Sequence, residues 1–313
     1  MTLSDLPTWF VRTFAVAFGL IWGSFANVVI CRLPRGMSVA HPPSHCPACG
    51  KAIAPFDNIP VVSFLLLRGR ARCCRTRLSF RYPLVELIGG ALSLAIVEVV
   101  IFQLAGSTPL GRAVALYLID FALALALVSA AFIDAETMIL PDSITLGGTA
   151  LAIATCTLRG LPMTESLFGA AISFFIVWFP FIFAYRRIRG FPGMGLGDAK
   201  LMALVGGWFG YRGALFVLFA GAIQGTLFAL VTFLLRGRID EPEAVLKERA
   251  EMQAAADAGD EEARQLLVED PIGREPEPGL RSARIAFGPC LILGAIEYLL
   301  GAPFIDRLLS WAQ

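Results

Sequence analysis

Apolar runs long enough to cross a lipid bilayer constrain this chain more than any other feature of its sequence. A helix needs about 20 apolar residues to span a hydrocarbon core roughly 30 Å thick. Eight candidate runs occur, of which the fourth and sixth are short: residues 9–30, 84–104, 113–133, 144–158, 167–184, 201–209, 214–235 and 285–300. Hydrophobic residues make up 57% of the chain and charged residues only 16%. We therefore expect an all-α polytopic membrane protein with about eight transmembrane helices.

The basic residues predict how these helices are oriented. Arginines and lysines cluster between the first two apolar runs, and three more arginines follow the fifth run. The positive-inside rule places both of these loops in the cytoplasm. If the chain crosses the membrane at each run, Asp134 and Asp198 then lie on the same, cytoplasmic side.

Changes in composition predict five parts along the chain. Residues 1–30 form a first transmembrane helix, and residues 31–82 form a small cytoplasmic domain rich in proline, arginine and cysteine. Residues 83–235 form the transmembrane core. Residues 236–284 are an acidic cytoplasmic insert, an exposed helix or a partly disordered segment. Residues 285–313 form a final transmembrane helix and the C-terminus.

Two aspartates at the ends of apolar runs are the candidate catalytic residues. Asp134 ends the third run, and Asp198 follows a glycine-rich stretch that leads into the sixth run. A carboxylate at the edge of a membrane segment is costly unless it is paired or functional. We expect Asp134 and Asp198 to face each other and share one proton. The structural alternatives are that the glycines only form a flexible turn, and that Asp134 only pairs with Lys200.

Two carboxylates sharing a proton have the chemistry that peptide hydrolysis needs. One takes a proton from water while the other polarises the carbonyl group and protonates the leaving nitrogen. No metal is expected at this site. Gly195 and Gly197 would let a substrate backbone approach closely. We therefore predict substrate-binding roles for Gly195, Gly197, Lys200 and Glu86, although Glu86 could instead simply pair with Arg81 or reach the membrane interface.

Four cysteines predict a metal site in the cytoplasmic domain. Cys46 and Cys49 form a Cys-x-x-Cys pair, and the adjacent Cys73 and Cys74 follow about two dozen residues later. Cytoplasmic thiols stay reduced, so spaced cysteines there favour Zn²⁺ over disulfides. The second pair is irregular, because adjacent side chains are expected to point apart and Ala71 stands where a regular pair would have cysteine. An unmetallated site is the alternative.

As a set, these motifs resemble those of the type IV prepilin peptidases, the leader peptidase and N-methyltransferase family. The matching residues cover most of the chain: Gly23 to Val28, Cys46 to Cys49, Asn58 to Pro60, Leu67 to Arg70, Ser79 to Pro83 with Glu86, Ile133 and Asp134 with Leu140 to Asp142, Gly193 to Leu201, and Phe287 to Pro289. The resemblance implies that Asp134 and Asp198 are the catalytic pair, the latter in a Gly-x-Gly-Asp motif at Gly195 to Asp198.

The resemblance also implies a substrate, a cofactor and a location. Members cleave a short basic leader after a glycine in type IV prepilins and pseudopilins, which serve type IV pili and type II secretion. They then methylate the new N-terminal residue, usually Phe, using S-adenosylmethionine. The implied location is the bacterial inner membrane, with many passes, contact with lipid and an active site facing the cytoplasm. No nucleic acid partner is expected.

Two functions of other classes remain open from the residues alone. Membrane carboxylates also relay protons in transporters, so a proton-coupled transporter is one alternative. The other is a non-catalytic assembly scaffold of a pilus or secretion machine, organised by its zinc domain, in which the two aspartates are only structural.

Overall fold

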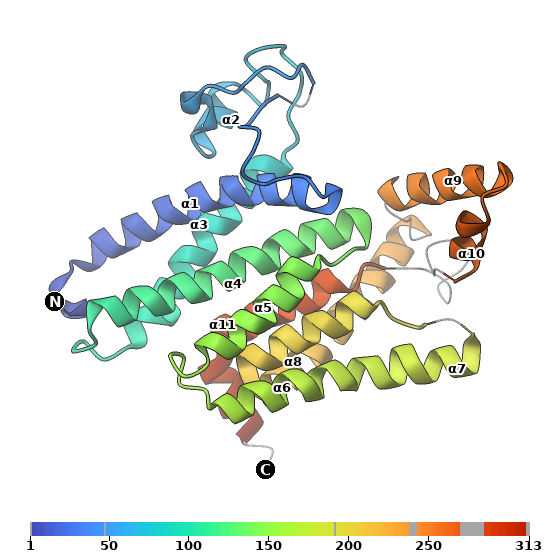
Figure 1. The fold of residues 1–313 in the computed structure, drawn as a ribbon. Helices are drawn as coiled ribbons and strands as arrows, with labels where there is room; N and C mark the ends of the chain where they lie inside the picture. The colour runs from blue at the N-terminus through green and yellow to red at the C-terminus, as the bar shows by residue number, and fades with distance from the viewer. Residues whose placement is uncertain (1, 47, 191, 238–242, 270–284, 311–313) are drawn as a thin grey trace. The chain divides into compact units, whose positions relative to one another are not determined.

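The computed structural model describes residues 2–46, 48–190, 192–237, 243–269 and 285–310. Within these residues the regular structure is helical, with three isolated β-bridges and no strand. Figure 1 shows the helices in chain order, which are α1 (Thr8–Arg32), α2 (Val62–Leu66), α3 (Arg81–Val99), α4 (Leu110–Thr137), α5 (Asp142–Thr155), α6 (Met163–Val177), α7 (Tyr185–Arg189), α8 (Leu196–Arg236), α9 (Glu243–Asp257), α10 (Glu261–Glu269) and α11 (Gly288–Ser310).

The predicted class is confirmed, whereas the predicted number of eight spans is not. Five helical segments of the described chain are long and apolar enough to cross a membrane: residues 8–35, 81–103, 110–137, 163–189 and 196–236. A shorter apolar helix covers Gly288–Ala302. The fourth predicted span corresponds to α5, which has only 14 residues. The sixth and seventh correspond to one interrupted helix, α8.

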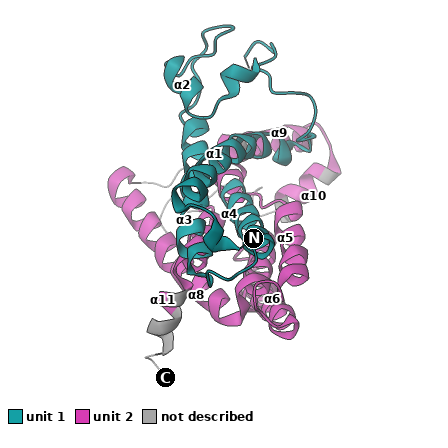
Figure 2. Ribbon diagram, turned by 90° about the vertical axis from the view of Figure 1, so that its left-hand side faces the viewer, with its two compact units in different colours: residues 1–129, 306–313 teal, residues 130–305 magenta. Residues whose placement is uncertain are grey.

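The chain divides into two compact units, which Figure 2 shows in different colours. Unit 1 comprises residues 1–129 and 306–313, and unit 2 comprises residues 130–305. Helix α4 supplies residues to both units, because it runs from Leu110 to Thr137. The cysteine-containing domain belongs to unit 1. Asp134 and Asp198 both belong to unit 2.

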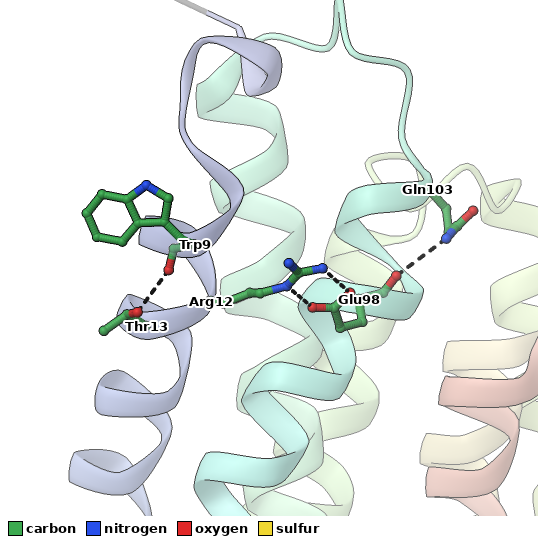
Figure 3. Close-up of polar contacts among 5 residues, drawn as sticks. All are labelled: Trp9, Arg12, Thr13, Glu98 and Gln103. Carbon is green, nitrogen blue, oxygen red and sulfur yellow. Dashed lines mark hydrogen bonds and ion pairs between the residues drawn. The ribbon is translucent and has the colours of Figure 1, made fainter.

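Unit 1 is built on the close crossing of α1 and α3. A methyl group on Gly19 would collide with the carbonyl oxygen of Gly89, so the two backbones touch at this point. Small residues allow such close packing between membrane helices. Toward the N-terminal end of α1, Arg12 and Glu98 form an ion pair in which Arg12 Nη2 lies 3.1 Å from Glu98 Oε2 (Figure 3).

Unit 2 contains a second close crossing of the same kind, between α6 and α8. A methyl group on Gly169 would collide with the carbonyl oxygen of Gly206, and one on Gly206 would collide with the carbonyl oxygen of Gly169. Ser166 in α6 also donates a hydrogen bond of 2.7 Å to the carbonyl oxygen of Gly207. These contacts fix the first half of α8, which begins with the residues around Asp198.

Helix α8 is interrupted at Gly210. Its 41 residues would extend about 60 Å as one straight helix, about twice the hydrocarbon thickness. Gly210 has φ 71° and ψ −179°, which is not helical. Only glycine adopts this conformation readily. The interruption divides α8 into two apolar halves, in agreement with the two separate runs expected on either side of this position.

Two local features have clear causes in the sequence. Pro180 lacks a backbone N–H, and the residues around it, Trp178–Ala184, form a π-helical segment that follows α6. In the acidic insert, residues 243–257 and 261–269 form the helices α9 and α10. The other parts of the insert, residues 238–242 and 270–284, lie outside the described residues.

Candidate active site

Asp134 lies in the last turn of α4, with its side chain inside unit 2. Only 5% of the residue is exposed, and its neighbour Ile133 is fully buried. The helix ends three residues later, at Thr137, because Met138 adopts a positive φ of 54° and Pro141 follows. Asp134 Oδ2 is buried and has no hydrogen-bond partner among the described residues. A buried carboxylate oxygen without a partner is costly and marks a candidate functional group.

Asp198 lies in the first turn of α8, where the glycine-rich stretch enters the helix. Gly195 has extended backbone geometry and precedes the first helical residue. Its backbone N–H donates a hydrogen bond to the Asp198 carboxylate, while the N–H of Asp198 donates to the carbonyl oxygen of Gly195 at 3.2 Å. Asp198 is 9% exposed. The loop therefore holds this carboxylate in a defined position.

Leu140 and Gly288 hold the ends of three helices together around the two aspartates. A methyl group on Gly288, the first residue of α11, would lie 2.6 Å from Asp134 Oδ2 and 3.3 Å from Leu140 Cδ1. A methyl group on Gly197 would lie 3.0 Å from Leu140 Cβ. Leu140 thus fits between the start of α8 and the start of α11, where neither neighbour has room for a side chain.

The two carboxylates interact electrostatically, as the charge of Asp134 acts on Asp198. Both are buried in unit 2, and Leu140 touches a glycine beside each of them. Two neighbouring carboxylates in a region of low dielectric constant resist being charged at the same time. This arrangement can hold one proton between two oxygen-bearing groups.

The predicted substrate-binding residues fall into two places. Gly195 and Gly197 lie beside Asp198, as the sequence suggests. Lys200 lies two residues after Asp198, but its ammonium group is 2.6 Å from Asp142 Oδ1 rather than paired with Asp134. This ion pair joins the first turns of α5 and α8. The roles of these three residues in substrate binding stay predictions.

Glu86 belongs to unit 1 and not to the unit that holds the aspartates. It is only 8% exposed. Its carboxylate accepts a hydrogen bond of 2.7 Å from the backbone N–H of Val61 and another from the Ser24 hydroxyl. Glu86 also lines a cavity of about 210 Å³ within unit 1. Its role in substrate binding stays a prediction.

The four predicted metal-binding cysteines come together in the cysteine-containing domain of unit 1. Their sulfur atoms all lie within 4.8 Å of one another. Cys46 Sγ is 3.6 Å from Cys74 Sγ, and Cys49 Sγ is 3.3 Å from Cys73 Sγ. The expectation that Cys73 and Cys74 point apart is wrong, because their sulfurs are 3.9 Å apart. Two tight turns, closed by the bridges His45↔Ala52 and Arg70↔Arg77, bring the pairs together.

The cysteine cluster fits a tetrahedral Zn²⁺ ion. Zn–S bonds of about 2.3 Å separate the sulfurs of such a site by about 3.8 Å, which is close to the distances found here. Hydrogen bonding by Thr76 lowers the pKa of the Cys74 thiol to about 6. Because thiolates are the metal-binding form, Cys74 is ready to act as a ligand. Cys46, Cys49, Cys73 and Cys74 would hold the ion, which would fasten the two turns to each other.

Three uncharged residues that shape these sites do not stand out in the sequence. Leu140 and Gly288 were noticed only within motifs, because their role depends on contacts between helices that are distant along the chain. Asn27 is 4% exposed, and its Oδ1 has no partner among the described residues. Asn27 could have been found in the sequence because it is a polar residue within the apolar run of residues 9–30.

Comparisons with known proteins identify two family matches in this chain. Residues 17–100 match the bacterial peptidase A24 N-terminal domain, and residues 121–230 match the type IV leader peptidase family. The second match contains both Asp134 and Asp198. The first contains the four cysteines and Glu86. No solved structure matches the chain significantly.

Several relatives are similar over most of their length, and each is named prepilin leader peptidase/N-methyltransferase. The protein from Burkholderia pseudomallei is 35% identical over 76% of this chain and 82% of its own. The Myxococcus xanthus protein is 32% identical over 99% and 96%, and the Klebsiella pneumoniae protein is 38% identical over 64% and 86%. The chain is therefore a member of the type IV leader peptidase family.

Proposed function

We propose that this enzyme removes the short basic leader of type IV prepilins or pseudopilins through Asp134 and Asp198, and then methylates the new N-terminal amine. The main support is the pair of buried, electrostatically interacting carboxylates in unit 2. The names of the relatives support both activities.

In the proposed cleavage step, the two aspartates share one proton. The ionised carboxylate takes a proton from water as the water oxygen attacks the scissile carbonyl carbon. The protonated carboxyl group donates a hydrogen bond to the carbonyl oxygen, where negative charge develops. Collapse of the tetrahedral intermediate breaks the C–N bond, and the leaving nitrogen receives a proton from the pair. The proton belongs to the pair and is not assigned to either residue.

The glycines beside Asp198 support this mechanism sterically. Gly195 and Gly197 present backbone without side chains, and an extended peptide can pair with such a segment through main-chain hydrogen bonds. In this proposal the cleavage site faces the cytoplasm in the bacterial inner membrane, as the distribution of arginines and lysines indicates. The basic leader is then presented on the side where it is made.

S-adenosylmethionine supplies the methyl group in this proposal. The cavity of about 210 Å³ in unit 1 is smaller than the roughly 300–1,000 Å³ of pockets that hold drug-sized ligands, so it does not fit the whole cofactor. A second cavity, of about 370 Å³, is lined by Arg68, Arg70, Arg72 and Arg75. Four guanidinium groups repel the positively charged sulfonium group. No step of methyl transfer is derived from either cavity.

Incubation of the purified protein with a prepilin tests the proposal directly. Mass spectrometry of the product should show leader removal with or without S-adenosylmethionine, and a mass increase of one methyl group on the new N-terminus only when S-adenosylmethionine is present. An intact prepilin would contradict the proposal. Acid-coupled solute uptake by vesicles that contain the protein, without cleavage, would favour a transporter instead.

A further inference from the structure

The cavity in unit 1 has the features of a ligand site, and neither Asp134 nor Asp198 is among the residues that line it. It lies between the C-terminal half of α1, the N-terminal part of α3 and the cytoplasmic domain. Much of its wall is apolar and is formed by Val28, Ile53, Ile59, Phe64, Leu67 and Leu78. The buried polar side chains that also line it are those of Asn27, Arg32, Ser63 and Glu86. Ligand sites typically combine an apolar wall with a few polar groups in this way.

Two buried side chains of this cavity, Asn27 and Glu86, offer acceptors to a cation, while Arg32, the buried cation of its wall, donates from Nη1 to the carbonyl oxygen of Ser38 at 3.1 Å. Asn27 Nδ2 donates to the carbonyl oxygen of Tyr82 at 3.0 Å, which leaves Asn27 Oδ1 as a buried acceptor without a partner. The Glu86 carboxylate accepts from the Val61 N–H and the Ser24 hydroxyl, and it forms no ion pair among the described residues. A buried negative charge of this kind is costly until a cation pairs with it.

We propose that this cavity binds the free N-terminal residue of the cleaved pilin, with its α-ammonium group against Glu86 and Asn27. This inference rests on the proposed function, since it assigns a place to the amine that is to be methylated. The size of the cavity suits one residue rather than a nucleoside cofactor. Its apolar wall suits the side chain of a large N-terminal residue such as Phe. An ammonium group donates charge-assisted hydrogen bonds to both acceptors.

The assignment separates the two activities between the two units. The peptide bond is cleaved at the aspartates of unit 2, and the new amine is held by residues of unit 1. A peptide that already has a free N-terminal Phe should bind without any involvement of Asp134 or Asp198.

Binding of short synthetic peptides to the full-length protein tests this site apart from catalysis. The two probes are a peptide that begins with Phe and the same peptide with its amine acetylated, each titrated calorimetrically into the detergent-solubilised enzyme. We expect acetylation to weaken binding at least tenfold, because it removes the positive charge. The Glu86→Gln variant should lose this discrimination. The matched variant Glu98→Gln, in the same helix but outside the cavity wall, should retain it.

A variant of the apolar wall provides a second test that does not depend on Glu86. Val28→Phe reduces the space in the cavity, and it should weaken binding of a peptide that begins with Phe more than binding of one that begins with Ala. Equal affinity for free and acetylated peptides in the wild-type protein would overturn the proposal. So would the loss of S-adenosylmethionine binding, with unchanged peptide binding, in Glu86→Gln, because the cavity would then belong to the methyl donor.

The same measurements distinguish failure of this site from failure of the proposed function. Binding that depends on the free amine, in a protein that does not methylate the peptide, would support the site and contradict the proposed methyltransferase activity. Methylation of the peptide by wild-type protein and Glu86→Gln with equal KM would support the activity and contradict the site.

Discussion

At the scale of single residues, the absence of a side chain at position 288 is as important as the acidic groups. The backbone of Gly288 lies against the Asp134 carboxylate, and a methyl group there would be 2.6 Å from Asp134 Oδ2. The carboxylate can rotate away at little cost, since it is the end of a flexible side chain. Glycine is therefore needed at this position for the geometry of the site more than for stability of the fold.

Gly288→Ala should reduce leader removal about 100-fold, because displacement of a catalytic group by about 1 Å has an effect of that size. The thermal unfolding midpoint should change little. Initial rates of prepilin cleavage and a thermal unfolding curve in detergent measure the two effects. Gly147→Ala is the matched control, since no atom lies within 4 Å of the added methyl group. A cleavage rate near that of wild type in Gly288→Ala would contradict this description of the site.

The ion pair between Lys200 and Asp142 should matter much less. The Asp142 side chain is 59% exposed and that of Lys200 22%. Exposed ion pairs contribute about 0–1 kcal/mol to stability. Asp142→Asn should therefore retain more than half of the cleavage activity and most of the unfolding midpoint. A large loss of activity, measured in the same prepilin assay, would give Asp142 or Lys200 a role in substrate binding that the structure does not indicate.

At the scale of helices, each unit contains one close crossing of two helices at glycines. In unit 2, the backbones of Gly169 and Gly206 touch, because a methyl group on either glycine would collide with the carbonyl oxygen of the other. A methyl group at Gly169 meets backbone rather than a movable side chain, so α6 and α8 have to separate. Such overpacking typically costs about 1–3 kcal/mol.

Gly169→Ala should accordingly lower the free energy of unfolding by about 1–3 kcal/mol, whereas Gly147→Ala in α5 should leave it unchanged or raise it by about 0.5–1 kcal/mol through helix propensity. Unfolding of both variants in mixed micelles, followed by circular dichroism, measures the difference. Equal stability of the two variants would mean that α6 and α8 do not pack through this contact.

Much of the helical structure could be predicted from the sequence, because apolar runs of bilayer length leave the chain few alternatives. The runs at residues 9–30, 84–104 and 113–133 correspond to α1, α3 and α4. The predicted count of eight spans is not confirmed. The run at residues 144–158 corresponds to α5, Asp142–Thr155, which has only 14 residues, and the runs at 201–209 and 214–235 belong to one helix, α8, whose interruption at Gly210 lies between them.

The candidate site could be predicted in part. Asp134 and Asp198 stand out because charge is rare in apolar runs. The contacts around them could not be predicted, because Leu140 meets Gly197 and Gly288 across distances of dozens of residues in sequence. The arrangement of Cys73 and Cys74 was predicted incorrectly, since the turn that closes between Ala71 and Thr76 redirects both side chains. The cavity beside Glu86 depends likewise on packing between α1, α3 and the cysteine-containing domain.

At the scale of the whole molecule, the cysteine cluster should affect one activity more than the other. A domain of about 50 residues has too small a core to be stable alone and commonly needs a metal. Replacement of Cys46 and Cys49 by serine removes two of the four ligands. Because the proposed amine site lies against this domain and the aspartates belong to unit 2, methylation should fall more than cleavage. Mass spectrometry of the mature pilin N-terminus reports both activities in one sample.

Removal of the metal should reproduce this effect without a substitution. A strong zinc chelator should reduce methylation, and added Zn²⁺ should restore it, while leader removal continues. Metal analysis of the purified protein should find about one Zn²⁺ per chain. Equal loss of both activities, in the chelated protein or in the double cysteine variant, would show that the domain only supports the fold.

The central claim is that Asp134 and Asp198 act together as one catalytic pair. The most direct measurement is the rate of leader removal from a purified prepilin by Asp134→Asn, Asp198→Asn and the matched variant Asp142→Asn, each inserted in membranes at equal amounts. We predict that either of the first two variants lowers the rate by at least about 100–10,000-fold while the third stays within twofold of wild type. Cleavage at the wild-type rate by either Asp134→Asn or Asp198→Asn would contradict the account.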